Sequence, residues 1–204
     1  MEETNTTLTV NLQPTEEERV LSTIKVGDML LVNSKGLLPR LIRYYMKRYD
    51  NKFCAGILDR YYNHMAVVVD MWGELHSADA TAKGFQIRPL LQVYDAVRFT
   101  KEDNHVEVKR PVVEFTEDEK RLISEQAVKY SIVQTKYEFL NFLWWIVYIT
   151  TNKRLFIGGN KDKKLFCFEG TSRCINAGRP MFLEPVLTTT PDVQYDERFT
   201  TIYV

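Results

Sequence analysis

The sequence contains little cysteine, and neither sign of charge is in excess. Its three cysteines, Cys54, Cys167 and Cys174, form an odd and sparse set among 204 residues. Such a set does not suggest a disulfide framework, and we expect a reducing compartment. Lys+Arg and Asp+Glu both total 27, so the net charge is zero. This balance gives no electrostatic reason to expect nucleic-acid binding.

The sequence also lacks a hydrophobic run long enough to cross a membrane. Its most apolar segment, FLNFLWWIVYI at residues 139–149, is too short, because a spanning helix needs about 20 residues. We predict a buried core helix over residues 137–150, with a surface helix that contacts lipid or a protein partner as the alternative. The acidic, polar start MEETNTTLTVNLQPTEEER is unlike a secretory signal. We therefore expect a cytoplasmic, virus-encoded or virion-associated protein.

The order of the predicted elements indicates an α+β fold with a mainly antiparallel sheet packed against helices. Apolar runs predict strands at residues 26–32, 64–69, 74–78, 84–88 and 94–100. Gly73 supplies the turn of a hairpin between the second and third of these strands. Residues 106–115 have no clear preference. We expect one domain over residues 25–178, after a polar arm over 1–24 and before a C-terminal extension over 179–204.

Helical spacing of apolar residues predicts helices at residues 37–48, 117–130, 137–150 and 168–177, and a short one at 15–22. The pair Thr116 and Glu119 has the spacing of a capping box, which marks the start of the second helix. A glycine-rich loop is expected at residues 158–160. Proline is frequent after residue 179, and this composition predicts a loosely structured C-terminal segment.

Cys167 follows a strand-like pair of residues and comes at the predicted start of a helix, in the stretch KKLFCFEGTSRC. The first turn of a helix has unpaired N–H groups and a positive dipole end, which favour a thiolate and can receive an oxyanion. From the residues alone, a buried cysteine that acts as a small hydrophobe is the leading alternative. Cys54 and Cys174 are interpreted as packing residues.

His64 is the candidate base for such a cysteine, because it begins an apolar strand whose end can reach a cleft. A histidine at this position can also be purely structural. Asp79, on the partner strand of the hairpin, is the candidate residue that orients the imidazole, and His76 is the alternative orienting residue. No pair of cysteines or histidines has zinc-ligand spacing, so we predict no metal site and no cofactor.

Four motifs occur in an order that resembles a known enzyme family. They are KVGDMLL at residues 25–31, NHMAVVV at 63–69, GELHSADA at 73–80 and GFQIRPL at 84–90, and they are followed by Tyr137-Glu138 and by FCFE at 166–169. Together they resemble the circularly permuted papain-like amidases of the NlpC superfamily, YiiX/YaeF branch. Because histidine precedes cysteine here, the order matches the permuted branch. The likeness covers about residues 25–178.

The resemblance implies that Cys167 is the nucleophile, His64 the base and Asp79 the third residue of a triad. It further implies hydrolysis or transfer of peptide or lipid-like acyl groups through an acyl-thioester, without a metal. Phe168 stands where the family has a small serine, and Gly170 replaces an apolar residue. These departures favour the alternative hypothesis, a non-catalytic papain-like module that binds partners within a larger assembly such as a virus particle.

Overall fold

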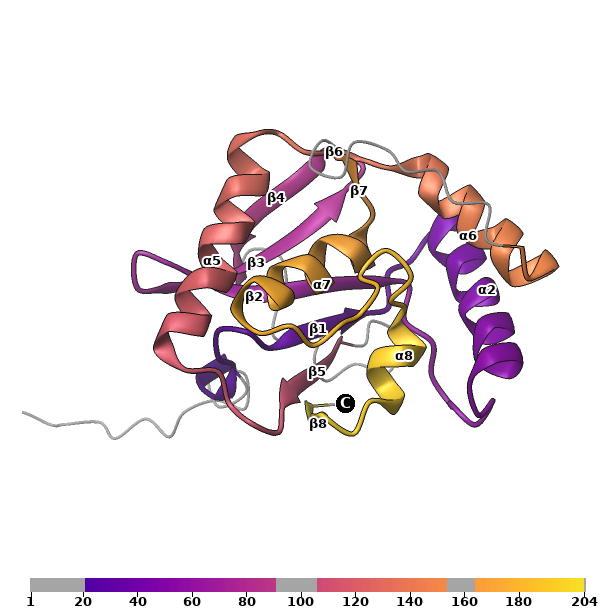
Figure 1. Cartoon of the computed structure of the whole chain (residues 1–204), viewed down its shortest axis with the longest axis horizontal. Helices are drawn as coiled ribbons and strands as arrows, with labels where there is room; N and C mark the ends of the chain where they lie inside the picture. The colour runs from indigo at the N-terminus through magenta and orange to yellow at the C-terminus, as the bar shows by residue number, and fades with distance from the viewer. Residues whose placement is uncertain (1–20, 91–105, 154–163, 204) are drawn as a thin grey trace, which may run out of the picture.

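A computed structural model describes residues 21–90, 106–153 and 164–203, and within them the chain forms a twisted antiparallel sheet of six strands (Figure 1). The strands are ordered β4-β3-β2-β1-β5-β8. They are β1 (Met29–Val32), β2 (His64–Met71), β3 (Glu74–Thr81), β4 (Gly84–Pro89), β5 (Val106–Pro111) and β8 (Phe199–Tyr203). A parallel pair of short strands, β6 (Lys136–Tyr137) and β7 (Lys164–Leu165), is separate. The predicted α+β class is confirmed.

Two helices, α5 (Glu117–Ile132) and α7 (Cys167–Gly178), cover one face of this sheet (Figure 1). The larger apolar core lies between these helices and the sheet, and includes Met65, Val67, Ile123 and Ile175. A smaller cluster on the opposite face contains Leu30, Val68 and Val108. Apolar residues alternate between the two clusters along β2, as expected for a strand with both faces buried.

The hairpin between β2 and β3 is confirmed, and its two turn residues have positive φ angles. Trp72 has φ 59° and Gly73 has φ 86°, and the strands flanking this two-residue turn pair directly from Met71 and Glu74 onward. Two positive φ angles are typical of the turns that match the twist of a hairpin. The register set by this turn places Ala78 opposite Val67, which determines where Asp79 lies relative to His64.

The capping box predicted for α5 is present: the Thr116 hydroxyl accepts from the Glu119 N–H, and the Glu119 carboxylate accepts from the Thr116 N–H. The helix predicted at residues 37–48 is also present as α2 (Leu37–Phe53). For these two helices, apolar periodicity and N-cap chemistry were sufficient to predict where each begins.

The apolar segment forms a helix, α6 (Phe139–Thr151), and the side chains described for it, from residue 143 onward, are buried at some positions and exposed at others. Trp145 stacks on Tyr49 of α2, with ring centroids 5.9 Å apart, whereas Leu143 is 54% exposed. Helices α2 and α6 lie side by side, to one side of the sheet (Figure 1). The prediction of a core helix was therefore wrong for the exposed face. Among the described residues, no helix is both long and apolar enough to cross a membrane.

The C-terminal segment is more ordered than its proline content predicted. It contains α8 (Thr190–Tyr195), which is capped by Thr189 and Asp192, and β8, which pairs with β5 at the edge of the sheet. The prediction of a loosely structured segment was wrong. The strand predicted at 94–100, the loop at 158–160 and most of the helix at 15–22 lie outside the described residues.

Two glycines bring α7 close to its neighbours, and their substitution should have different effects. A Cβ on Gly178 would lie 2.7 Å from the backbone oxygen of Glu119, whereas one on Gly170 would lie 3.1 Å from the ring of Phe85. We expect Gly178→Ala to lower the free energy of unfolding by about 1–3 kcal/mol, because the backbone of Glu119 cannot move away from the added methyl group without distorting α5. Gly170→Ala should change the free energy of unfolding less. The Phe85 ring can shift to make room, and alanine is more favourable than glycine inside a helix by about 1 kcal/mol. Urea denaturation of both variants measures this, and equal losses would contradict the explanation.

Candidate active site

His64 is the first residue of β2, where it pairs with Val32 of β1. Its side chain is 20% exposed, and its Nε2 atom lies 2.7 Å from Oδ2 of Asp79. Because Nε2 bonds the carboxylate, Nδ1 is the nitrogen that remains for a proton-transfer partner. The predicted pairing of His64 with Asp79 is therefore present in the structure.

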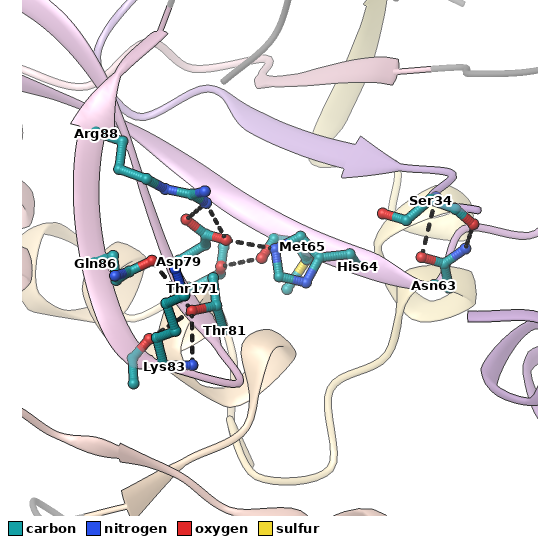
Figure 2. Close-up of polar contacts among 11 residues, drawn as sticks. Ser34, Asn63, His64, Met65, Asp79, Thr81, Lys83, Gln86, Arg88 and Thr171 are labelled. Atoms are coloured by element: carbon teal, nitrogen blue, oxygen red, sulfur yellow. Dashed lines mark hydrogen bonds and ion pairs between the residues drawn. The ribbon is translucent and has the colours of Figure 1, made fainter. Parts of the chain in front are cut away.

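Asp79 lies on β3 with its side chain only 1% exposed, and it also binds Arg88 of β4. The Arg88 Nη2 atom donates to both carboxylate oxygens, at 2.8 and 3.0 Å. Figure 2 shows the carboxylate between the guanidinium and the imidazole. Burial alone would raise the pKa of Asp79, but the hydrogen bonds and charges of His64 and Arg88 hold it below its ordinary value. The carboxylate therefore stays ionised next to the ring.

Cys167 is the first residue of α7, as predicted, and its side chain is buried. Burial alone would lower the pKa of His64, but the hydrogen bond to Asp79 and the neighbouring Cys167 raise it to about 10. The imidazole is thus bonded to a carboxylate and also interacts with Cys167. The structure brings all three predicted residues together, from two strands and the start of a helix.

A buried hydrogen bond fixes α7 on β2 next to this group. The hydroxyl of Thr171 donates to the backbone oxygen of Met65 at 3.1 Å. Thr171 lies one helical turn after Cys167, and Met65 follows His64 directly. Since an unpaired buried hydroxyl is costly, this contact disfavours sliding of the helix along the strand. It therefore helps to set the position of the sulfur relative to the imidazole.

A cavity of about 330 Å³ opens beside the group, with both polar and apolar walls. The residues on its polar side include His64, Asp79, Arg88 and Tyr137, and the apolar side includes Val32, Leu38, Pro39 and Ile42. Cys167 does not line this cavity. The cavity gives a ligand access to the imidazole, whereas the sulfur is not exposed in it.

Tyr137, at the end of β6, interacts with the sulfur of Cys167. Burial raises the pKa of Tyr137, and the neighbouring sulfur raises it further. The phenol therefore remains a proton donor at neutral pH. A donor at this place can stabilise negative charge that develops near the sulfur.

His76, the alternative orienting residue, is not part of the group. Its Nδ1 atom contacts the backbone oxygen of Glu74 at 3.0 Å, within the same strand. His76 and Asp79 are three residues apart on β3, so their side chains emerge on opposite faces. Of the two candidates, only Asp79 contacts His64.

The other residues singled out in the sequence have structural positions. Cys174 is fully buried, and its burial raises the pKa of its thiol. Burial and the carboxylates of Asp192 and Asp50 raise the pKa of Cys54 to about 12. Phe168 packs edge-on against Phe166 in the core and does not line the cavity. It therefore does not narrow the cavity, as its size had suggested it could.

Arg88 is the residue of the group that sequence reasoning missed. It belongs to the GFQIRPL motif at residues 84–90, but neither its residue type nor its spacing predicts a role in the site. The usable signal was the strand register: Arg88 lies opposite Ser77, two residues from Asp79 on the same face of the sheet.

The fold, but not the sequence, is similar to a solved structure. The metalloprotein YiiX from Escherichia coli O157:H7 aligns over 87% of this chain and 96% of its own, with a TM-score of 0.57 and 13% identity. At this identity the likeness shows the fold alone, and it confirms the predicted YiiX-like fold. No protein-family model matches the sequence, and no curated protein matches it either.

YiiX is described as a metalloprotein, and that property is not transferred to this chain. In residues 21–90, 106–153 and 164–203, no three His, Cys, Asp or Glu side chains are grouped so that they could hold a metal ion. Asp79, moreover, already binds both His64 and Arg88. The residues present do not fit a metal centre at the candidate site.

Proposed function

We propose that this protein is a cysteine hydrolase or acyltransferase in which Cys167 is the nucleophile, His64 the base and Asp79 the orienting carboxylate. The observation that supports this most directly is the imidazole of His64, which is bonded to a buried carboxylate and interacts with a cysteine at a helix N-terminus. These are the components of a thiol acyl-transfer site. The order of the sequence motifs, which resembles that of the permuted papain-like amidases of the NlpC superfamily, is the second support for this proposal.

In the proposed reaction, the thiol proton of Cys167 passes to His64, and the sulfur attacks the carbonyl carbon of an amide or ester. The oxyanion accepts hydrogen bonds from the N–H groups of the first turn of α7 and from the Tyr137 hydroxyl. His64 then protonates the leaving amine or alcohol, and the tetrahedral intermediate collapses to an acyl-thioester. Water, or another alcohol or amine, then gives up a proton to His64 and bonds to the thioester carbonyl carbon. The C–S bond breaks, the acyl group leaves with its new partner, and His64 returns the proton to the sulfur.

The test is a panel of cell-wall peptides and acyl esters incubated with the full chain and with Cys167→Ala. We expect turnover of at least one member, together with a mass increase on Cys167 equal to the acyl group. Loss of one triad residue typically reduces turnover by a factor of about 10⁴ or more. If turnover persists in Cys167→Ala, or if an acyl group is found only on other residues, the proposal is wrong.

The alternative, a non-catalytic module, is favoured by one observation. The Cys167 side chain is only 1% exposed and lies outside the cavity wall. A sulfur that no substrate can reach would leave a papain-like scaffold that only binds. The reactivity of the thiol separates these two functions.

A further inference from the structure

The outward face of α2 has a combination of residues that the proposed function does not use. Leu37 is 87% exposed, Tyr44 is 58% exposed and Leu41 is 43% exposed. Leu37, Leu41 and Tyr44 recur at intervals of three and four residues, so they form one stripe along the first two turns. An exposed apolar stripe on an outer helix indicates a surface that contacts something apolar.

Cations flank this stripe, and their charge is not neutralised by acids on the same face. Arg40, Lys47 and Arg48 are exposed, and none of their side chains forms a hydrogen bond or ion pair with another described residue. The only acid of α2 is Asp50, which is buried and accepts from the Tyr61 hydroxyl and the Gly56 N–H. This face of the helix is therefore both apolar and positively charged.

A second cavity, of about 530 Å³, lies beside the same helix and concentrates this charge. Its lining contains four cations and one acid: Arg40, Arg43, Lys47, Arg60 and Asp59, with Asn33, Tyr44, Tyr61 and Tyr62 completing the wall. Burial lowers the pKa of Arg43, and the positive charge of Arg40 lowers it further. Arg43 is fixed by hydrogen bonds to the Asn33 side chain and the backbone of Ser34. Closely spaced guanidinium groups of this kind favour an anion between them.

We propose that α2 docks this protein on the surface of a membrane that contains anionic phospholipids. The leucines and Tyr44 enter the boundary between head groups and acyl chains, and Arg40, Lys47 and Arg48 bind the phosphates, with one head group at the mouth of the basic cavity. A free small anion would account for the cations but not for the exposed leucines. The mixture of exposed leucine and unpaired cations on one helix matches an interfacial helix.

Docking through α2 would have a consequence for the first cavity. Leu38, Pro39 and Ile42 of the same helix line the cavity beside His64. A membrane bound on the outer face would therefore lie close to the opening that leads to the candidate active site. The docking proposal itself does not depend on catalysis, because it rests on residues outside the triad.

The experiment is flotation of the full chain with vesicles of phosphatidylcholine alone and of phosphatidylcholine with phosphatidylglycerol. We expect binding to the anionic vesicles only, with an affinity that falls as salt is added. Arg40→Ala/Lys47→Ala should weaken binding about thirtyfold, since each cation near an anionic surface contributes about fivefold. Leu37→Ser/Leu41→Ser should weaken it about tenfold or more, because the inserted side chains lose their apolar contact.

Matched variants on other surfaces serve as controls. Lys83→Ala/Lys153→Ala removes two exposed cations elsewhere, and Leu183→Ser removes a fully exposed leucine; both should bind like the unaltered chain. Cys167→Ala should also bind normally, so a failure of the proposed chemistry would not affect this result. Circular dichroism checks that each variant is folded.

Three results would overturn the proposal: no binding to anionic vesicles, equal binding to neutral ones, or equal losses in the control variants. Calorimetry with inorganic phosphate and with glycerol phosphate measures separately whether the basic cavity binds small anions. Binding of these small anions through Arg40 and Lys47, without vesicle binding, would identify an anion site and exclude membrane docking.

Discussion

Iodoacetamide at pH 6.5 is expected to alkylate Cys167 about tenfold to a hundredfold faster than Cys54 or Cys174, and His64→Ala is expected to remove this preference. An ordinary thiol, with a pKa of about 8.5, is only about 1% ionised at that pH. Under the proposed mechanism, His64 takes up the thiol proton of Cys167 as its sulfur attacks the reagent, at the N-terminus of α7. The other two thiols lie in surroundings that raise their pKa.

Peptide mass spectrometry after timed labelling gives a separate rate for each cysteine. His76→Ala is the matched control, because His76 is a strand histidine that does not contact the group, and it should leave the preference unchanged. Slow labelling of all three cysteines at similar rates would contradict the acyl-transfer proposal. It would favour the non-catalytic module, in which the sulfur is inaccessible.

Asp79→Asn is expected to lower the pKa of His64 from about 10 by more than one unit. The bond to the Asp79 carboxylate is the largest of the interactions that raise this pKa, and burial opposes it. An amide cannot supply the negative charge that stabilises the imidazolium. NMR titration of labelled histidines measures the change, with His64→Gln to assign the resonance. A midpoint that stays near 10 would show that the carboxylate does not control the ring.

The same substitution should change how stability depends on pH. The pKa of His64 in the folded chain is raised above its ordinary value of 6.5. The interaction therefore stabilises the fold fully below about pH 6.5 and is lost as the pH rises through about 10. In Asp79→Asn this loss should begin at lower pH. Thermal unfolding between pH 6 and 10 follows the difference between the two proteins.

The sequence was sufficient to predict His64 and Asp79 as neighbours because both lie on one hairpin. A strand–turn–strand pattern with a glycine turn determines the register, and the register determines which side chains meet across the strands. Arg88 required one further strand pairing, between β3 and β4, and the identity of an arginine gives no sign of such a role. Contacts that depend on several pairings in series are hard to predict from local patterns.

The C-terminal elements were missed for a different reason. Proline was taken as a sign of irregular structure, yet Pro191 lies in the first turn of α8, where a missing N–H costs nothing. Thr189 and Asp192 had the spacing of a capping box, and residues 199–203, FTTIY, have the composition of a strand. Attention to position rather than to composition would have predicted both elements.

For α6, the sequence could not show which partner would bury the helix. Its apolar residues surround the whole helix, so periodicity does not select a face. The structure resolves this through aromatic contacts with α2, where Phe53 stacks on Tyr148 with centroids 5.1 Å apart. Which face of α6 is buried therefore depends on where α2 presents its aromatic side chains, and the sequence of α6 does not contain that information.

The hydrogen bond from Thr171 to Met65 joins residues that are 106 positions apart in the chain. The hairpin that holds the imidazole and its carboxylate forms from near neighbours, whereas the helix that brings the sulfur must close a very long loop. Acid, base and thiol therefore assemble at different stages of folding. Mutations between α7 and the sheet could separate the thiol from an otherwise intact hairpin, giving a chain that keeps much of its structure but lacks a working nucleophile.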